Sequence, residues 1–279
     1  MTQIIVLGLD GACWPLLEPW LQAGDLPHLV ALREQAAWGP LTSQLPPVTA
    51  PNWRCYATGR NPAKLGVFWW EVVDREQHTI RHPTARDFHT RPLWDELADD
   101  GQRVAVLNFP SGYPPTPIKG GRFAAGGPGA KDVGFAYPAE WETELRQRYN
   151  YHVHPADVLR SAEQVEIRLD KILSIMQSRF DVAFDLLYDG IDFLHITIFY
   201  INVLHHFCYR GQPTRAGWQL IDRNLGRLHK IAGEQGYNLL LMSDHGCGPV
   251  DTVFYVNTWL EQEGYLHVTS SPVASRLGR

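Results

Sequence analysis

Side chains that could hold a metal ion or attack a phosphate occur at four separate places in the sequence. Asp10 and Asp244-His245 each follow an apolar run, and Asn202 with His206 follows a third. Carboxylate oxygens and neutral imidazole nitrogens are ligands that zinc takes. Thr49 offers a hydroxyl, and a bound cation could lower its pKa and offset charge on a phosphate oxygen. Together these residue types indicate metal-assisted phosphoryl transfer.

Thr49 lies in the stretch Leu45–Trp53, which reads Leu-Pro-Pro-Val-Thr-Ala-Pro-Asn-Trp. The two prolines before Thr49 hold the chain extended, because proline fixes φ and biases the preceding residue away from helix. Pro51 suits the first turn of a helix, which can continue to Thr58 until Gly59 ends it. We therefore expect Thr49 at a helix N-terminus, where free N–H groups favour an anion. An ordinary N-cap is the alternative for this hydroxyl.

Each of the other candidates also has a purely structural interpretation. Asp10 could cap the helix that follows it, Asp244-His245 could form a turn, and His206 could lie on a helix face. His195 lies inside an apolar run, which is typical of a histidine packed in the core. The combination of these residues favours a functional site more than any one of them does.

Three apolar runs must position these candidates. Gln3–Leu9, Phe193–Ile201 and Asn238–Met242 are rich in aliphatic, β-branched and aromatic residues and are predicted to be buried strands. The carboxyl ends of parallel strands meet at one edge of a sheet, where open α/β sheets bind their ligands. We therefore expect the polar residues that follow the three runs to converge, although they are far apart in the sequence.

Strands alternate with helices along the chain, which favours a mostly parallel sheet covered by helices, in one domain over residues 1–279. Arg103–Asn108 is a further predicted strand. Helices are predicted over Trp14–Ala23, Pro27–Ala37, Pro92–Asp100, Tyr137–Tyr149, Ser161–Asp189 and Ala216–Glu234. Alternation predicts a hairpin in Phe68–His82, and the Gly- and Pro-rich Ser111–Lys131 predicts a loop. Together they could form a cap inserted around residues 68–135.

The composition is that of an ordinary globular protein, with 279 residues, 44% hydrophobic and 20% charged. A net charge of −5 argues against binding a nucleic acid polymer through a basic surface. No apolar run reaches the roughly 20 residues that span a bilayer, so we expect no membrane insertion. The N-terminal residues lack the pattern of a signal peptide. Four widely separated cysteines without a CxxC pair are typical of free thiols, and we expect a cytoplasmic protein.

Several motifs occur in a characteristic order. They are Val6–Gly11, Pro47–Trp53, Thr58–Pro62 and Met242–Gly246, followed by Val256–Leu260 and Gly264–Leu266. Each is unspecific by itself, but together they run nearly from end to end of the chain. In this combination the sequence resembles the alkaline phosphatase superfamily, in particular its type I phosphodiesterase/nucleotide pyrophosphatase branch.

The resemblance implies a three-layer α/β/α fold of the alkaline phosphatase type and a covalent phospho-threonine intermediate. By position, Thr49 would be the nucleophile and Asn52 a donor to a phosphoryl oxygen. Asp10, Asp244 and His245 would bind one metal ion, with Oγ of Thr49 as its fourth ligand. Two ions are expected from the family, zinc or else manganese, bridged by the phosphate of a small phosphorylated substrate.

The second metal site departs from the family pattern. Members carry Asp-x-x-x-His after the strand that matches Phe193–Ile201, and both of those residues are ligands. Here Asn202 stands where the Asp is expected, while His206 is retained. A neutral amide oxygen is a much poorer zinc ligand than a carboxylate. Asp192 with His195 could replace the pair, but they lie before and inside the strand, at the wrong edge of the sheet.

Two further departures bear on function. The family supplies another metal-binding His downstream of the Asp-His motif and has longer members, so we expect a C-terminally truncated chain. Lys64-Leu65-Gly66 lacks the His that commonly precedes this Gly. One hypothesis is a metal-dependent phosphohydrolase acting through Thr49. The other is a degenerate one-metal member that binds phosphorylated ligands with little or no turnover, and a transferase or mutase is a third reading.

Overall fold

The computed structural model describes residues 2–74, 76–156 and 159–267. The chain forms two compact units, Met1–Cys247 and Gly248–Arg279. The second unit contains the short helix α11 (Val256–Gln262). The expectation of a single domain over the whole chain stays a prediction.

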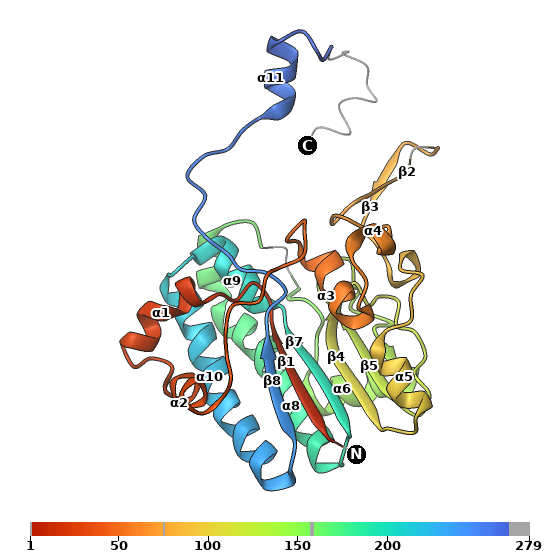
Figure 1. The fold of residues 1–279 in the computed structure, drawn as a ribbon, viewed down its shortest axis with the longest axis vertical. Helices are drawn as coiled ribbons and strands as arrows, with labels where there is room; N and C mark the ends of the chain where they lie inside the picture. The colour runs from red at the N-terminus through yellow and green to blue at the C-terminus, as the bar shows by residue number, and fades with distance from the viewer. Residues whose placement is uncertain (1, 75, 157–158, 268–279) are drawn as a thin grey trace. The chain divides into compact units, whose positions relative to one another are not determined.

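The first unit consists of strands and helices in alternation (Figure 1). Its strands are β1 (Ile4–Leu9), β2 (Val72–Asp74), β3 (Thr79–Arg81), β4 (Val104–Pro110), β5 (Arg122–Gly126), β6 (Ala136–Tyr137), β7 (Phe193–Ile198) and β8 (Asn238–Met242). Its helices are α1 (Trp14–Gln22), α2 (Pro27–Gln35), α3 (Thr49–Thr58), α4 (Pro62–Leu65), the 3₁₀ helix η1 (Ala85–Asp87), α5 (Leu93–Asp99), α6 (Ala139–Tyr149), α7 (Ala162–Ile167), α8 (Leu169–Tyr188), α9 (Tyr200–Cys208) and α10 (Gln212–Gln235).

The central sheet has the strand order β6-β5-β4-β7-β1-β8. Every neighbouring pair is parallel except β5 and β6, which are antiparallel. β1 lies between β7 and β8, with Leu9 opposite Ile198 and Gly8 opposite Met242. The carboxyl ends of these three strands therefore lie together at one edge of the sheet.

Helices cover both faces of this sheet. In β4, Oδ1 of Asn108 accepts a hydrogen bond from Arg179 of α8, whereas the next residue, Phe109, packs edge-on against Trp94 of α5. Trp94 of α5 also packs against His195 of β7, so α5 lies on the face of the sheet to which His195 points. α3 lies on the α5 side, because its Arg54 stacks over Phe109. Figure 1 shows α8 behind the sheet. The predicted three-layer fold with a mostly parallel sheet is confirmed.

One predicted loop is partly wrong. Ser111–Lys131 contains β5, which pairs in parallel with β4 inside the central sheet. Glycines surround this strand and make it look like a loop, but Gly126 is needed there, because a Cβ would collide with Oδ1 of Asn108. The predicted hairpin is confirmed as β2 and β3. A cap around residues 68–135 stays a prediction.

Two other boundaries differ from the sequence prediction. The strand expected over Phe193–Ile201 ends at Ile198, and α9 begins at Tyr200. The apolar residues there suit a helix with one buried face as well as a strand. The helix expected over Ser161–Asp189 is two helices, which meet at Arg168. Among the described residues, no helix is both long and apolar enough to cross a membrane.

Candidate active site

Asp10 and Asp244 meet at the carboxyl edge of the sheet. Asp10 directly follows β1, and Asp244 is the second residue after β8. Both are buried, with exposed fractions of 0% and 7%. Together with His245 they form a group in which the possible metal-binding atoms lie within 4.8 Å of one another, the one group of this kind among the described residues. The predicted convergence of the two strand ends is therefore observed.

In each of the two carboxylates, one oxygen accepts a hydrogen bond that fixes the side chain, and the other oxygen faces the site. Nε1 of Trp53 donates to Oδ2 of Asp10 at 2.8 Å, and the backbone N–H of Gly11 donates to Oδ1 of Asp244 at 3.2 Å. Oδ2 of Asp244 is buried and has no hydrogen-bond partner among the described residues. Outer contacts of this kind orient the ligands of a metal ion.

Trp53 reaches Asp10 because Gly8 has no side chain. A Cβ at Gly8 would lie 2.5 Å from Cη2 of the indole. The ring therefore lies directly on β1, and its N–H comes to the end of the same strand. A glycine at this point of the strand is explained by this close approach.

Thr49 is the first residue of α3, as expected for a hydroxyl at a helix N-terminus. Its Oγ1 lies 3.2 Å from Oδ1 of Asp10 and 2.9 Å from Nε2 of His245. It does not act as an N-cap, since that position is occupied by Val48. The structural alternative for this hydroxyl is thus excluded, and its oxygen lies among the acidic and imidazole groups.

The ring of His245 has a defined tautomer in this arrangement. Its Nδ1 lies 2.8 Å from the carbonyl oxygen of Gly246, which can only accept, so Nδ1 carries the hydrogen. Nε2 then has a free lone pair directed at Oγ1 of Thr49. An imidazole held by a backbone carbonyl in this way is the usual form of a metal-binding histidine.

The charges at this site are unfavourable without a cation. Burial first, and then the charge of Asp244, raise the pKa of Asp10 well above its usual range. Burial likewise raises the pKa of Asp244. Two buried carboxylates at this separation repel each other, and a divalent cation between them would reverse that balance. The donor set of two carboxylates, an imidazole and a hydroxyl fits such an ion.

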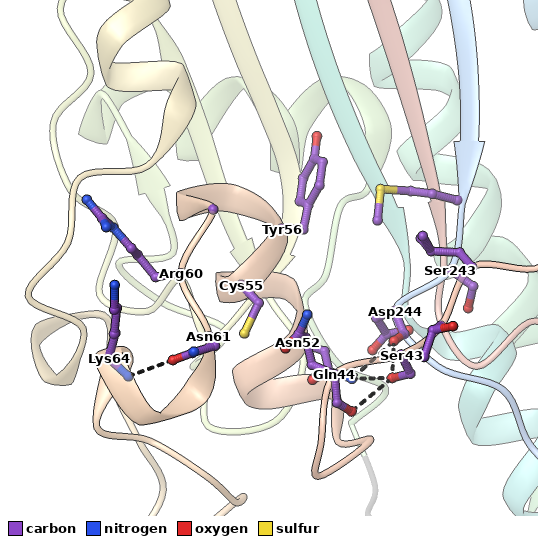
Figure 2. A pocket seen from close by; sticks show the side chains of 14 residues that line it. Ser43, Gln44, Asn52, Cys55, Tyr56, Arg60, Asn61, Lys64, Ser243 and Asp244 are labelled. Carbon is purple, nitrogen blue, oxygen red and sulfur yellow. Dashed lines mark hydrogen bonds between the residues drawn. The ribbon is translucent and has the colours of Figure 1, made fainter.

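Asn52 contacts this site from one helical turn further along α3. Its Nδ2 donates to Oγ of Ser43 at 2.9 Å and to the carbonyl oxygen of Asp244 at 3.1 Å (Figure 2). Both amide hydrogens are therefore engaged within the protein. Oδ1 of Asn52 is buried and has no partner among the described residues, so this side chain offers an acceptor.

The residues expected at a second metal ion lie on α9. Asn202 is buried, and its Oδ1 has no hydrogen-bond partner among the described residues. A Cβ at Gly11 would lie 2.5 Å from that oxygen, so Asn202 packs against the turn after β1. His206 is exposed, whereas its neighbour His205 is buried. Nε2 of His205 accepts from Nε1 of Trp218 at 3.0 Å, which leaves the hydrogen on Nδ1.

The alternative pair of Asp192 and His195 does not reach this site. Asp192 lies just before β7, where it accepts from the backbone N–H of Arg103 at 2.9 Å. His195 lies inside β7 among the rings of Trp53 and Tyr56, and burial lowers its pKa to about 3. The prediction of a packed core histidine is confirmed.

Two residues of the site were missed at the sequence level. Trp53 stood in the motif around Thr49, but nothing in the sequence indicated that its N–H would reach Asp10. Ser43 lies in a segment without regular structure, and its Oγ donates to the carbonyl oxygen of Asp244 at 2.8 Å. A serine in an irregular segment belongs to no periodic pattern that could place it near Asp244, so its position becomes known only from the fold.

The model of the family described as type I phosphodiesterase/nucleotide pyrophosphatase matches residues 4–278. No curated protein matches the chain.

Solved structures with the same fold include three enzymes. The chain is 20% identical to phosphonoacetate hydrolase from Sinorhizobium meliloti 1021 in complex with phosphonoacetate, with a TM-score of 0.67, covering 95% of this chain and 62% of that one. Murine ectonucleotide pyrophosphatase/phosphodiesterase 5, as an inactive variant with AMP, is 16% identical, with a TM-score of 0.52, covering 88% and 57%. Alkaline phosphatase PafA is 14% identical, with a TM-score of 0.58, covering 95% and 65%. The chain thus spans about three fifths of the length of these proteins.

Proposed function

The chain belongs to the type I phosphodiesterase/nucleotide pyrophosphatase family, and from this premise we propose that it is a metal-dependent phosphohydrolase in which Thr49 is the nucleophile. The observation that carries the proposal is the position of Oγ1 of Thr49, which lies 3.2 Å from Asp10 and 2.9 Å from His245. A threonine hydroxyl is a weak nucleophile unless a base or a cation activates it. Here both means of activation are within reach.

Asp10, Asp244, His245 and Oγ1 of Thr49 are the groups that would hold the ion. We propose zinc, with manganese as the alternative, because the donors are oxygen and imidazole nitrogen. When bound, the ion would lower the pKa of the hydroxyl and offset negative charge on the phosphate. Oδ2 of Asp244 supports this assignment, because this buried oxygen accepts no hydrogen bond from the described residues and lies 3.4 Å from Nε2 of His245, another of the groups that would hold the ion.

The chain's own residues account for the proton and for the position of the nucleophile. As the bond from Oγ1 of Thr49 to phosphorus forms, the hydroxyl proton passes to Asp10, whose Oδ1 lies 3.2 Å away, and the bond to the leaving-group oxygen breaks. Water then cleaves the phospho-threonine ester and restores the hydroxyl. Trp53 keeps Asp10 in place by its hydrogen bond to Oδ2. The N-terminus of α3 adds a favourable field for the anionic phosphate.

The substrate we propose is a small phosphate ester. Two of the solved structures with this fold hold small phosphorus-containing ligands, phosphonoacetate in one and AMP in the other. The amide hydrogens of Asn52 are not free to bind a phosphoryl oxygen, because they are donated to Ser43 and Asp244. Its role as a donor to a phosphoryl oxygen would require these hydrogen bonds to be exchanged for the substrate.

Hydrolysis of bis(p-nitrophenyl) phosphate with added zinc or manganese tests the proposal. Thr49→Ala should lose hydrolysis by several orders of magnitude, whereas Thr49→Ser, which keeps a hydroxyl, should retain part of it. Acid quenching during turnover should trap a phosphorylated peptide that contains residue 49 in the parent and none in Thr49→Ala. If Thr49→Ala hydrolyses the ester as fast as the parent, the nucleophile is assigned wrongly.

Asn202 favours a second candidate function, a one-metal member that binds phosphorylated ligands with little or no turnover. This residue stands where the family carries an Asp ligand, and a neutral amide holds a cation weakly. Counting the metal ions in purified protein separates the two candidates in combination with the assay. One ion per chain with no turnover supports the binding function, whereas two ions per chain would exclude it.

A further inference from the structure

A pocket of about 440 Å³ opens beside Asp244 (Figure 2). One wall consists of residues 41–44 and the end of β8, and the other consists of α3 and the segment Gly59–Lys64. Figure 2 shows Arg60 and Lys64 on the side opposite Ser243 and Asp244. A pocket of this volume has room for a group the size of a nucleoside or a small drug.

The near end of the pocket adjoins the proposed nucleophile. Asn52 lines the pocket and lies three residues after Thr49 on α3, so the two side chains share a face of the helix. Oδ1 of Asn52 is buried and has no hydrogen-bond partner among the described residues. The pocket therefore begins about one helical turn from the reacting hydroxyl, at an acceptor that none of the described residues satisfies.

The far end of the pocket is positively charged. α3 ends at Gly59, which adopts φ 63 and turns the chain into α4. The side chain of Asn61 is occupied in accepting from the backbone N–H of Lys64 at 3.0 Å. Arg60 and Lys64 both line the pocket, and neither forms an ion pair with any residue that the structure describes. Two cations without a counter-ion thus lie on the wall of one pocket.

The length of α3 sets the distance between the two ends. A helix rises 1.5 Å per residue, so the seven steps from Asn52 to Gly59 correspond to about 10 Å. The side chains of arginine and lysine are long and flexible, so they can also reach an anion that lies closer to Thr49. Tyr56 and Met242 also line the pocket and offer apolar surface to the bound group.

Resting on the proposed function, we propose that this pocket binds one arm of a phosphodiester, and that Arg60 and Lys64 bind a second anionic group on that arm. The substrate class is therefore a phosphate diester whose arm carries a phosphate or carboxylate up to about 10 Å from the scissile phosphorus. An arm without that charge fills the same pocket but leaves both cations unpaired. Charge-assisted hydrogen bonds from arginine and lysine to such a group supply the preference.

Two chromogenic esters test the substrate class. The p-nitrophenyl ester of thymidine 5′-phosphate has a neutral arm, and its 3′-phosphorylated form carries the second anion on the same arm. The parent should prefer the 3′-phosphorylated ester by about tenfold in kcat/KM, the size of one charge-assisted contact. In Arg60→Gln/Lys64→Gln the ratio of the two kcat/KM values should fall to about one.

A matched control distinguishes the effect of the two cations in the pocket from an effect of the protein's net charge. Lys119→Gln/Lys171→Gln removes the same two charges at exposed positions outside the pocket and should keep the ratio of the parent. Equal ratios in the parent and in Arg60→Gln/Lys64→Gln would overturn the proposal, and so would a parent that shows no preference.

A binding measurement keeps this proposal separate from the proposed function. Calorimetry on Thr49→Ala should show tighter binding of thymidine 3′,5′-bisphosphate than of thymidine 5′-monophosphate, and the difference should vanish when Arg60 and Lys64 are also replaced by Gln. If the parent hydrolyses neither ester but this difference is present, the hydrolase function fails and the anion subsite stands. If hydrolysis depends on Thr49 but the difference is absent, the subsite fails alone.

Discussion

Nε2 of His245 lies 2.9 Å from Oγ1 of Thr49, and Nδ1 of the same ring lies 2.8 Å from the carbonyl oxygen of Gly246. The imidazole is thus fixed from both sides, and its free lone pair points at the hydroxyl. One partner follows β8 and the other begins α3, so the geometry depends on the docking of α3 onto the sheet. Variants that disturb this docking or the buried charges beneath it should therefore change metal binding and stability.

Trp53→Phe should weaken metal binding while leaving the fold intact. The substitution removes the N–H that holds Oδ2 of Asp10 but keeps an aromatic ring over β1. Loss of such an outer contact should reduce zinc affinity by about 10–100-fold, measured by calorimetry. Trp94→Phe is the matched control, because Trp94 is equally buried but its Nε1 has no partner among the described residues. Equal zinc affinities in the two variants would contradict the role given to Trp53.

Asp244→Asn should stabilise the metal-free protein and abolish its stabilisation by metal. The pKa of Asp244 is raised by burial, and its charge also raises the pKa of Asp10, so removing that charge relieves a repulsion in the folded state. The amide oxygen can still accept from the backbone N–H of Gly11. Thermal unfolding with and without zinc measures both effects. Asp100→Asn, at an exposed carboxylate, should change neither, and a zinc response that survives in Asp244→Asn would count against the site.

Gly8→Ala should destabilise the protein and reduce its activity. The added Cβ would lie 2.5 Å from the indole of Trp53, so either the ring or the strand must move. Overpacking of this kind costs about 1–3 kcal/mol, which urea unfolding can measure. Gly233→Ala is the control, because Gly233 lies in α10 with open space around it, and alanine should stabilise that helix by about 0.5–1 kcal/mol. A Gly8→Ala variant as stable as the parent would show that α3 does not lie directly on β1.

The contribution of His195 to the free energy of unfolding should fall as the pH drops below about 6.5. Burial lowers the pKa of His195 to about 3, so this imidazole is neutral in the folded protein and gains a proton on unfolding. A histidine with a depressed folded pKa contributes stability that is present above its unfolded pKa and is lost as the pH falls towards the folded pKa. The loss is about 1.4 kcal/mol per pH unit for each such group.

Urea unfolding at pH 7.5 and 5.5 measures this loss, and His195→Phe should reduce the difference between the two pH values by about 1.4 kcal/mol. His205 acts in the same direction, since burial also lowers its pKa to about 3, so part of the difference should remain. His229→Gln, at an exposed position, should leave the difference unchanged. A difference that His195→Phe does not alter would mean that His195 can be protonated in the folded protein.

The convergence of Asp10 and Asp244 was predictable because it follows from topology. Both residues come after strongly apolar runs, and parallel strands leave such residues at one edge of the sheet. The start of α3 was also predictable, because Thr49 is followed by Pro51 in the first turn and the helix stops at Gly59. In these cases local chemistry and the overall fold require the same conformation.

Other features depend on contacts that no local pattern encodes. β5 is short and is flanked by glycines, and its pairing with β4 decides that it is a strand. The end of β7 was placed three residues late, because Tyr200 and Ile201 are apolar in either conformation. On α9 the spacing of the family motif selects His206, four residues after Asn202, and this assignment stays a prediction.

Residues 36–48 pass the active site without forming a helix or a strand. Ser43 anchors them beside the site, donating to the carbonyl oxygen of Asp244 and accepting from Asn52. The reacting groups, by contrast, are anchored to β1, β8 and α3. Changes in the length or the side chains of this segment on either side of Ser43 would therefore alter which esters fit. The groups that break the ester would keep their positions. Differences in substrate preference between related proteins should then lie in this segment rather than in the sheet.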